Sequence, residues 1–308
     1  MTKAIERPRR GIKERLFGNP VALKELRSQM RGARAVMVLT LYLTLTGGCV
    51  VLMYTLQVEA AKLTSMPVGS HIGQMLFFGV VAIELFLVIF IGPSLTAHAI
   101  SGERERRTYE LLRTTLLSAR TLVLGKLIAA LAYIVLLLFA TLPIQAIALL
   151  FGGVTPQEMA IITIILLASA FHFSTVGLYF SVSVKRTMPA SVAAYSYALV
   201  STLGLPLLSF LLNSLTSLSS NLHSPKLLQV SLIYLTDLTI GSSPITTSIA
   251  SQQLIAYHQT TGLYWQYLSN GERIPAVSPW IIFTFLTIVT SIVLIRISVR
   301  RIRRIADE

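Results

Sequence analysis

Long apolar runs separated by shorter polar segments dominate the chain. Several of these runs reach the roughly 20 residues that an α-helix needs to cross the hydrocarbon core of a bilayer. None of them alternates apolar and polar residues with the period of two that a membrane-spanning β-strand requires. The pattern therefore predicts an all-α polytopic membrane protein with six transmembrane helices, at residues 35–56, 76–100, 127–151, 159–184, 189–212 and 279–297.

The composition agrees with lipid as the surroundings of most of the chain. Of the 308 residues, 54% are hydrophobic and 13% are charged, and the mean hydropathy is +0.70. Soluble domains carry about a quarter charged residues, twice this share. The single cysteine, Cys49, excludes an intrachain disulfide framework and a zinc site built from several cysteines.

Basic residues are concentrated in alternate polar segments. Residues 1–34, 101–126, 185–186 and 296–304 hold 23 of the 26 Lys and Arg residues. In a soluble protein the formal net charge of +13 would suggest nucleic acid, but here the bases flank apolar runs and suit anionic lipid. The positive-inside rule predicts a multi-pass protein of the plasma or inner membrane with both termini in the cytoplasm. The membrane domain would then span residues 35–297, with a cytoplasmic N-terminus at 1–34 and a basic tail at 298–308.

The N-terminal segment contains a candidate amphipathic helix. Asn19 is a favourable helix cap and Pro20 a favourable first helical residue. The following residues alternate apolar with basic side chains, as in a helix that lies at the membrane interface. A solvated basic leader is the alternative.

Two connections on the predicted outer side differ in length. Gly152 to Pro156 reads as a tight turn. Residues 213–278 form a long external loop whose apolar second half is predicted to hold short re-entrant helices in the outer leaflet. A seventh span there is disfavoured by Asp237 and by the Gly241 to Pro244 break, and no folded external domain is expected.

Residues 101–126 mix acidic and basic residues more densely than any other stretch. At helical spacing, one broad face is polar and another carries Tyr109, Leu112 and Leu116. Ion pairs within a helix contribute only about 0.3–0.5 kcal/mol each, so stability alone does not explain the density. The segment is either a docking site for a soluble partner or an ordinary solvated helix. Its polar face comprises Glu103, Arg106, Arg107, Glu110, Arg113 and Thr114.

A few polar and aromatic residues lie inside predicted spans. Glu84 is costly at that depth unless it meets protein, water or a partner, so it belongs to a substrate path, a subunit interface or an interhelical hydrogen bond. His172 is interpreted as an interhelical hydrogen-bonding group. Tyr195 and Tyr197 either line an apolar path or simply pack.

Motifs of nucleotide hydrolysis and of other catalysis are missing. The phosphate-binding pattern GxxxxGK[ST] does not occur, and Gly125-Lys126 is only a fragment of it. No HExxH, GxSxG or CxxC motif occurs either. We therefore predict no catalytic, cofactor-binding or metal-binding residues in this chain, and no enzymatic activity of its own.

Four segments resemble the membrane subunit of ATP-binding cassette (ABC) transporters of the type-2 exporter family. NPVALKELRSQMRGAR resembles the elbow helix, and GERERRTYELLRTTLLSARTLVLGKL resembles the coupling helix, predicted at 101–118. LPIQAIALLFGGVTPQEM resembles the end of the third span, and SSPITTSIASQQL resembles the outer segment before the last span. One departure is Leu116, where the family often has proline, and this leaves the end of the coupling helix open.

The resemblance implies a complex rather than a lone chain. A second permease subunit, identical or a paralogue, and two ABC ATPase subunits that bind ATP and Mg²⁺ are the implied protein partners, with membrane lipids around them. The implied coupling-helix contacts with the ATPase are Glu103, Arg104, Arg107, Glu110, Leu111 and Leu112, and the bracing residues of the elbow are Pro20, Glu25 and Arg27.

The leading hypothesis is a permease that moves a hydrophobic or amphipathic substrate outward along a dimer interface lined by spans two and five, with Glu84, Tyr195 and Tyr197 as substrate-path candidates. One alternative is a mechanotransmission subunit that moves no cargo. The other is a membrane-embedded lipid-modifying enzyme, which would have to rely on Glu84 with His98 or His172.

Overall fold

The computed structural model describes residues 20–30, 33–64, 69–106, 118–221, 225–268 and 270–307. In chain order, the elements in these ranges are α2 (Pro20–Met30), α3 (Ala33–Thr64), α4 (Gly69–Thr96), α5 (Ser101–Glu105), α7 (Ala119–Phe151), α8 (Pro156–Ser183), α9 (Thr187–Leu199), the π-helical turn η1 (Val200–Gly204), α10 (Leu205–Asn221), α11 (Lys226–Ile240), α12 (Pro244–His258), β1 (Leu263–Tyr267), β2 (Arg273–Val277) and α13 (Pro279–Asp307).

The helical membrane architecture predicted from the apolar runs is confirmed. Within the described residues, 6 helices are long and apolar enough to cross a membrane, and they correspond one to one to the predicted spans. The fifth is continuous through α9, η1 and α10, so it ends at Asn221 and not at residue 212. The third starts at Ala119, eight residues before the predicted start at 127, because Ser118 caps it. The Ser118 hydroxyl accepts a hydrogen bond from the Thr121 backbone N–H at 3.2 Å.

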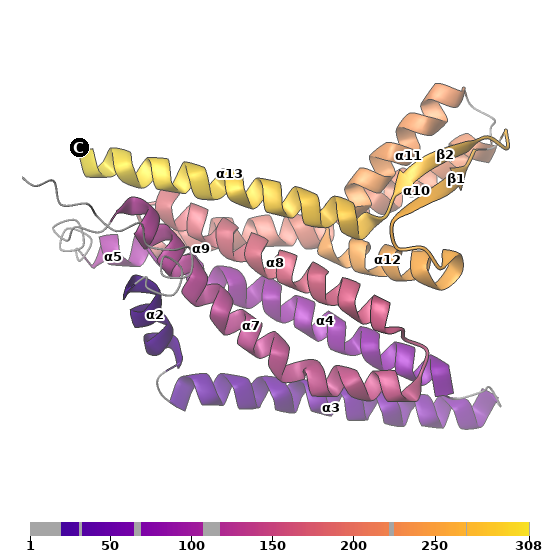
Figure 1. Ribbon diagram of the computed structural model, residues 1–308, viewed down its shortest axis with the longest axis horizontal. Coiled ribbons are helices and arrows are strands. Elements are labelled where there is room, and N and C mark those ends of the chain that lie inside the picture. The colour runs from indigo at the N-terminus through magenta and orange to yellow at the C-terminus, as the bar shows by residue number, and fades with distance from the viewer. Residues whose placement is uncertain are drawn as a thin grey trace, which may run out of the picture.

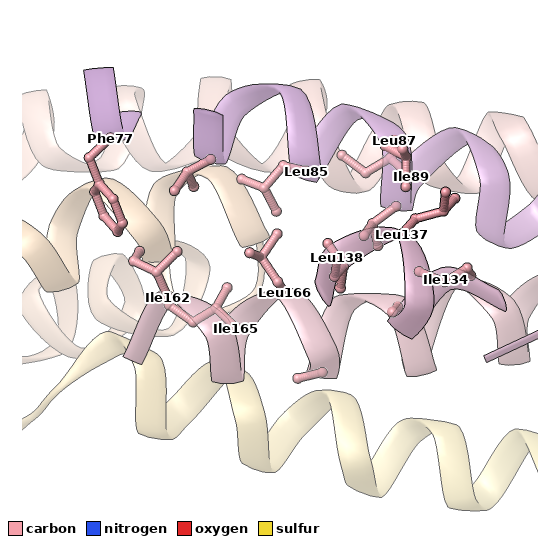
Figure 2. Packing of buried hydrophobic residues seen from close by; sticks show 14 of the residues in the cluster. Phe77, Leu85, Leu87, Ile89, Ile134, Leu137, Leu138, Ile162, Ile165 and Leu166 are labelled. Atoms are coloured by element: carbon pink, nitrogen blue, oxygen red, sulfur yellow. The ribbon is translucent and has the colours of Figure 1, made fainter. Parts of the chain in front are cut away.

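Helix α8 is the central element of the bundle. It packs against α4, α13 and α7, and 67% of its most apolar window is buried, compared with 11% for α3. Helix α3 lies along the outside of α4 and α7 (Figure 1). Figure 2 shows Phe77 and Leu85 of α4 facing the α8 side chains Ile162, Ile165 and Leu166. In a soluble protein, burial of each such side chain would contribute about 1.5–3 kcal/mol. Between helices in lipid, close packing supplies the attraction instead.

Glycine brings α4 and α8 into close contact. A side chain at Gly177 would overlap the side chain of Thr96 and press on the backbone of Pro93. Gly92 on α4 faces Phe173 and Ser174 on α8 in the same way. Small residues at such crossings allow the backbones to approach, which is how membrane helices gain contact energy.

The turn between α7 and α8 is confirmed at Gly152 to Pro156. Gly152 and Gly153 have φ values of 82° and 83°, which favour glycine. Thr155 and Glu158 then form a capping box at the start of α8, with Pro156 at its first turn. The start of α4 packs tightly on this turn, since a side chain at Gly73 would overlap the Gly152 carbonyl.

The outer segment 213–278 is more folded than expected. The break at Gly241 to Ser243 separates α11 from α12, so the short helices are present. The antiparallel hairpin of β1 and β2 was not predicted, and it pairs Leu263 with Val277 and Tyr267 with Arg273. Gly271, with φ of 80°, makes its turn. Figure 1 shows α10, α11 and the hairpin projecting from one end of the bundle.

The opposite end collects α2, α5 and the C-terminal end of α13 (Figure 1). The basic residues that the structure describes are also divided unequally between the two ends of the bundle. Most of them belong to α2, α5, the start of α7, the α8–α9 connection and the end of α13, whereas Lys226 and Arg273 lie on α11 and β2 at the other end. The charge asymmetry seen along the chain is therefore also an asymmetry in space.

The α4–α8 contact leads to a test of stability. We expect Gly177→Leu to lower the free energy of unfolding by about 1–3 kcal/mol, because the added side chain has no room between the helices. The matched control is Gly48→Leu on α3, where nothing lies within 4 Å of an added Cβ. Thermal unfolding of the two purified variants in detergent measures the difference, and equal melting temperatures would contradict this packing.

Candidate functional site

An apolar groove lies between α4 and the fifth span. Its volume is about 630 Å³, and α12 closes one side of it. Tyr195, Thr202 and Ser248 are the lining residues that carry a polar side-chain atom. The apolar lining comprises Phe78, Val81, Ala82, Leu85, Phe86, Ile89 and Phe90 of α4, Ala198, Leu199 and Leu203 of the fifth span, and Ile245 and Ile249 of α12.

Tyr195 lies where the groove continues along α9. Its hydroxyl donates a hydrogen bond to the Phe90 carbonyl at 3.1 Å, and the two ring centroids are 6.0 Å apart. A second, more open hollow shares Tyr195 and Leu199 and extends to Thr187 at the start of α9. The candidate residue Tyr195 therefore lies at the junction of two hollows on one face of the fifth span.

The groove wall contains the π-helical turn η1. Pro206 lacks the backbone N–H that would bond the Thr202 carbonyl, and its ring crowds that carbonyl. The chain opens into a wider turn just before the proline, with the Leu205 N–H bonding the Val200 carbonyl. Such turns occur frequently at functional sites. Here the turn places Thr202 and Leu203 in the groove lining.

Tyr197 does not belong to the groove lining but contacts the central helices. Its hydroxyl is 2.7 Å from Nε2 of His172 on α8. Nδ1 of His172 is 3.2 Å from the Ser291 hydroxyl on α13. This polar cluster joins three helices, which is the interhelical role predicted for His172.

Glu84 faces α7, although its neighbours Val81 and Leu85 line the groove. Its side chain is fully buried, with one carboxylate oxygen bound by the Thr141 hydroxyl and the other by Nε2 of Gln145 at 2.6 Å. This geometry matches the interhelical hydrogen bond that was one of the interpretations of Glu84.

Helix α5 is attached to the end of α8 and the start of α9. The Ser181 hydroxyl accepts hydrogen bonds from the backbone N–H groups of Ile100 and Ser101 at 2.9 and 3.1 Å. Arg104 donates to the Val182 carbonyl at 3.2 Å. The Glu105 carboxylate accepts from the Thr187 hydroxyl at 2.7 Å. A displacement of α5 would therefore act directly on α9.

A salt bridge also ties α5 to α7. Nζ of Lys126 is 2.7 Å from a carboxylate oxygen of Glu103, and the Lys126 side chain is only 5% exposed. Sequence reasoning treated Lys126 as a phosphate-loop fragment and missed this pairing, although a lysine at the start of an apolar run was a signal. Of the residues implied by the resemblance, Arg107, Glu110, Leu111 and Leu112 lie outside the described residues, as do all residues 107–117 of the predicted coupling helix 101–118.

Helix α2 packs on α7 at the same end of the bundle. It begins at Pro20, as predicted. Ala22 is buried, Glu25 is half-buried and Arg27 is exposed. The exposed basic side chains thus lie opposite the face that contacts α7.

The residues invoked for an enzyme have separate partners. Glu84 bonds Thr141 and Gln145, whereas His172 bonds Tyr197 and Ser291. His98 lies in the turn after α4 and is exposed. In the described ranges, no group of three or more His, Cys, Asp or Glu side chains is placed to hold a metal ion.

Comparison with known families agrees with this architecture. A family model described as ABC-2 family transporter protein matches residues 19–298, from the start of α2 to near the end of α13. None of the curated proteins searched matches the chain. Members of this family are membrane permease subunits of ABC transporters, which associate with an ABC ATPase subunit. Since the match covers most of the chain and all six spans, the chain belongs to the ABC-2 transporter family.

Proposed function

We propose that this permease moves a hydrophobic or amphipathic substrate outward, driven by ATP hydrolysis on separate ATPase subunits. The groove between α4 and the fifth span carries the proposal. Its volume of about 630 Å³ lies within the range of roughly 300–1,000 Å³ usual for small-molecule sites.

The lining of the groove favours an apolar cargo. An apolar molecule gains about 25 cal/mol for each Å² of surface removed from water. A bare ion would lose its hydration, and the three lining hydroxyl groups of Tyr195, Thr202 and Ser248 would replace little of it. An amphipathic molecule could place its polar group beside these hydroxyls.

The groove is half open, which supports a dimer. Phe86 on α4, with Val192 and Leu203 on the fifth span, leave 62%, 59% and 56% of their surfaces exposed. Such a surface is covered by lipid or by another apolar protein surface. We propose that a second permease subunit, identical or a paralogue, faces this groove and encloses the substrate path.

The charge asymmetry supports the orientation of the complex. The end that holds α2, α5 and the C-terminal arginines is the one that the positive-inside rule assigns to the cytoplasm. Both chain termini then lie on the side where ATP is available, in a plasma or inner membrane. The groove leads from this side toward α12 at the outer end.

The attachment of α5 supports a route for the energy of ATP hydrolysis. A displacement of α5 would be transmitted to α9 through the hydrogen bond between Glu105 and Thr187, and to α7 through the salt bridge between Glu103 and Lys126. Helix α9 continues into the groove wall. We expect Arg107, Glu110, Leu111 and Leu112 to contact the ATPase next to α5, and α2, with Pro20, Glu25 and Arg27, to brace it.

One observation favours a second candidate function. The folded unit of α11 and the hairpin projects from the outer end, where it could transmit motion to another protein (Figure 1). Reconstituted vesicles distinguish the two functions. ATP hydrolysis with movement of a lipophilic probe supports transport, whereas hydrolysis without movement of any probe supports mechanotransmission.

Filling the groove tests the substrate path. We expect Ala82→Trp to reduce ATP-driven movement of a fluorescent lipophilic probe by about tenfold, because the indole occupies volume that the substrate needs. Ala146→Trp on α7 is the matched control, since Ala146 is exposed and lies outside the groove lining. Transport is measured in proteoliposomes that contain the permease and its ATPase. Equal transport by the two variants would sink the proposed path.

Charge exchange tests the connection between α5 and α7. We expect Glu103→Lys to reduce probe transport by about tenfold, because it places a second cation beside the buried Lys126. The double variant Glu103→Lys, Lys126→Glu restores the ion pair and should recover transport. Glu110→Lys should instead weaken co-purification of the ATPase. If the double exchange fails to recover transport while the ATPase stays bound, the Glu103–Lys126 pair does not transmit the motion.

A further inference from the structure

A second cavity, polar and much smaller, lies at the outer end of the molecule. Its volume is about 190 Å³, and α10, α11, α12, β1 and the first residue of α13 form its walls. Asp237 of α11 is the charged residue in its lining and is 8% exposed. The other polar lining residues are Asn213, Thr216, Thr236, Tyr264 and Gln266.

Among the described residues, Gln266 is the one side chain that donates a hydrogen bond to Asp237. Nε2 of Gln266 lies 3.3 Å from each of its carboxylate oxygens, which is long for a hydrogen bond to a charged group. Within the described ranges, no lysine, arginine or histidine forms a salt bridge with Asp237. Buried carboxylates are usually paired or bound to a metal, so Asp237 departs from that rule.

The oxygens of Thr216, Thr236 and Tyr264 add acceptors to the wall of the cavity. The hydroxyl hydrogens of Thr216 and Thr236 are directed to the carbonyls of Leu212 and Leu232 on their own helices. The two hydroxyl oxygens are 3.2 Å apart, and their remaining lone pairs are acceptors at the cavity wall. The Tyr264 oxygen accepts a hydrogen bond from Gln266 at 2.8 Å. The cavity is thus rich in acceptors around one negative charge.

We propose that this cavity binds a primary ammonium group on a small molecule or on a lipid head group. An ammonium group has three N–H donors and no acceptor, which matches a carboxylate surrounded by hydroxyl oxygens. The volume of about 190 Å³ corresponds to about six water molecules of 30 Å³ each, enough for a short aminoalcohol.

The site is separate from the apolar groove and does not depend on the cargo. Ile245, Ser248 and Ile249 of α12 line the groove, whereas Ala250 and Leu254 of the same helix line the polar cavity. A failure of the transport proposal would therefore leave this inference standing, and the reverse also holds.

Burial also gives the site a dependence on pH. Burial raises the pKa of Asp237 from 3.8 to about 6, although the Gln266 hydrogen bond opposes the shift. Tyr264, whose pKa is raised to about 12, is the other titratable residue that lines the cavity and stays neutral. Asp237 is charged at pH 7.5 and protonated at pH 5, while an alkylammonium keeps its proton at both. Binding should therefore weaken as the pH falls through 6.

The test measures thermal stability of the full chain with ethanolammonium chloride. Ligand that binds the folded state raises the melting temperature. We expect stabilisation at pH 7.5, little at pH 5, and an affinity about tenfold or more weaker in Asp237→Asn. The control variant Glu272→Gln removes an exposed carboxylate in the turn of the hairpin, which pairs with Lys226 at the start of α11 and lies outside the cavity lining, and this variant should bind normally.

Further measurements distinguish a soluble ligand from a lipid head group and check that the variant is folded. Asp237→Asn should be at least as stable as the natural chain without ligand at pH 7.5, since it removes a buried charge. A response to free ethanolammonium supports a soluble ligand. A response confined to nanodiscs that contain phosphatidylethanolamine, compared with phosphatidylglycerol, supports a lipid head group. No response in either arm, equal binding by Asp237→Asn, or the same stabilisation by sodium chloride at equal ionic strength overturns the proposal.

Discussion

The contact between α4 and α8 is the constraint on which the other helices depend. In lipid, apolar surface alone does not hold helices together, so close backbone approach has to supply the attraction. Gly177 and Gly92 provide that approach, and α8 then offers its remaining faces to α7 and α13. The groove is a consequence of this arrangement, because α4 presents one face to α8 and leaves another to meet the fifth span.

Polar residues within the predicted spans also hold the helices together, through hydrogen bonds between them. Glu84 joins α4 to α7, and His172 joins α8 to α9 and α13. Each cluster satisfies polar groups that lipid could not, which fixes the rotation of the helices that carry them. The two clusters lie on different helix pairs, so together they orient five of the spans.

Hydropathy was sufficient to predict the six spans, the turn at Gly152 to Pro156 and the break at Gly241, because burial in lipid demands long apolar helices whatever their packing. The lining of a substrate path by spans two and five stays a prediction, because hydropathy alone does not determine which helices face a substrate. The hairpin was missed, although Asn270-Gly271 between alternating residues is a strong hairpin signal. The attachment of α5 could not be predicted, since Ser181, Thr187 and Lys126 are distant in sequence and only the tertiary fold brings them to it.

Helix α12 gives the outer end of the molecule a mechanical property. Residues spaced three or four apart on one of its faces line the apolar groove, and residues on another face line the polar cavity. Any movement of α12 would therefore change the walls of the apolar groove and of the polar cavity together.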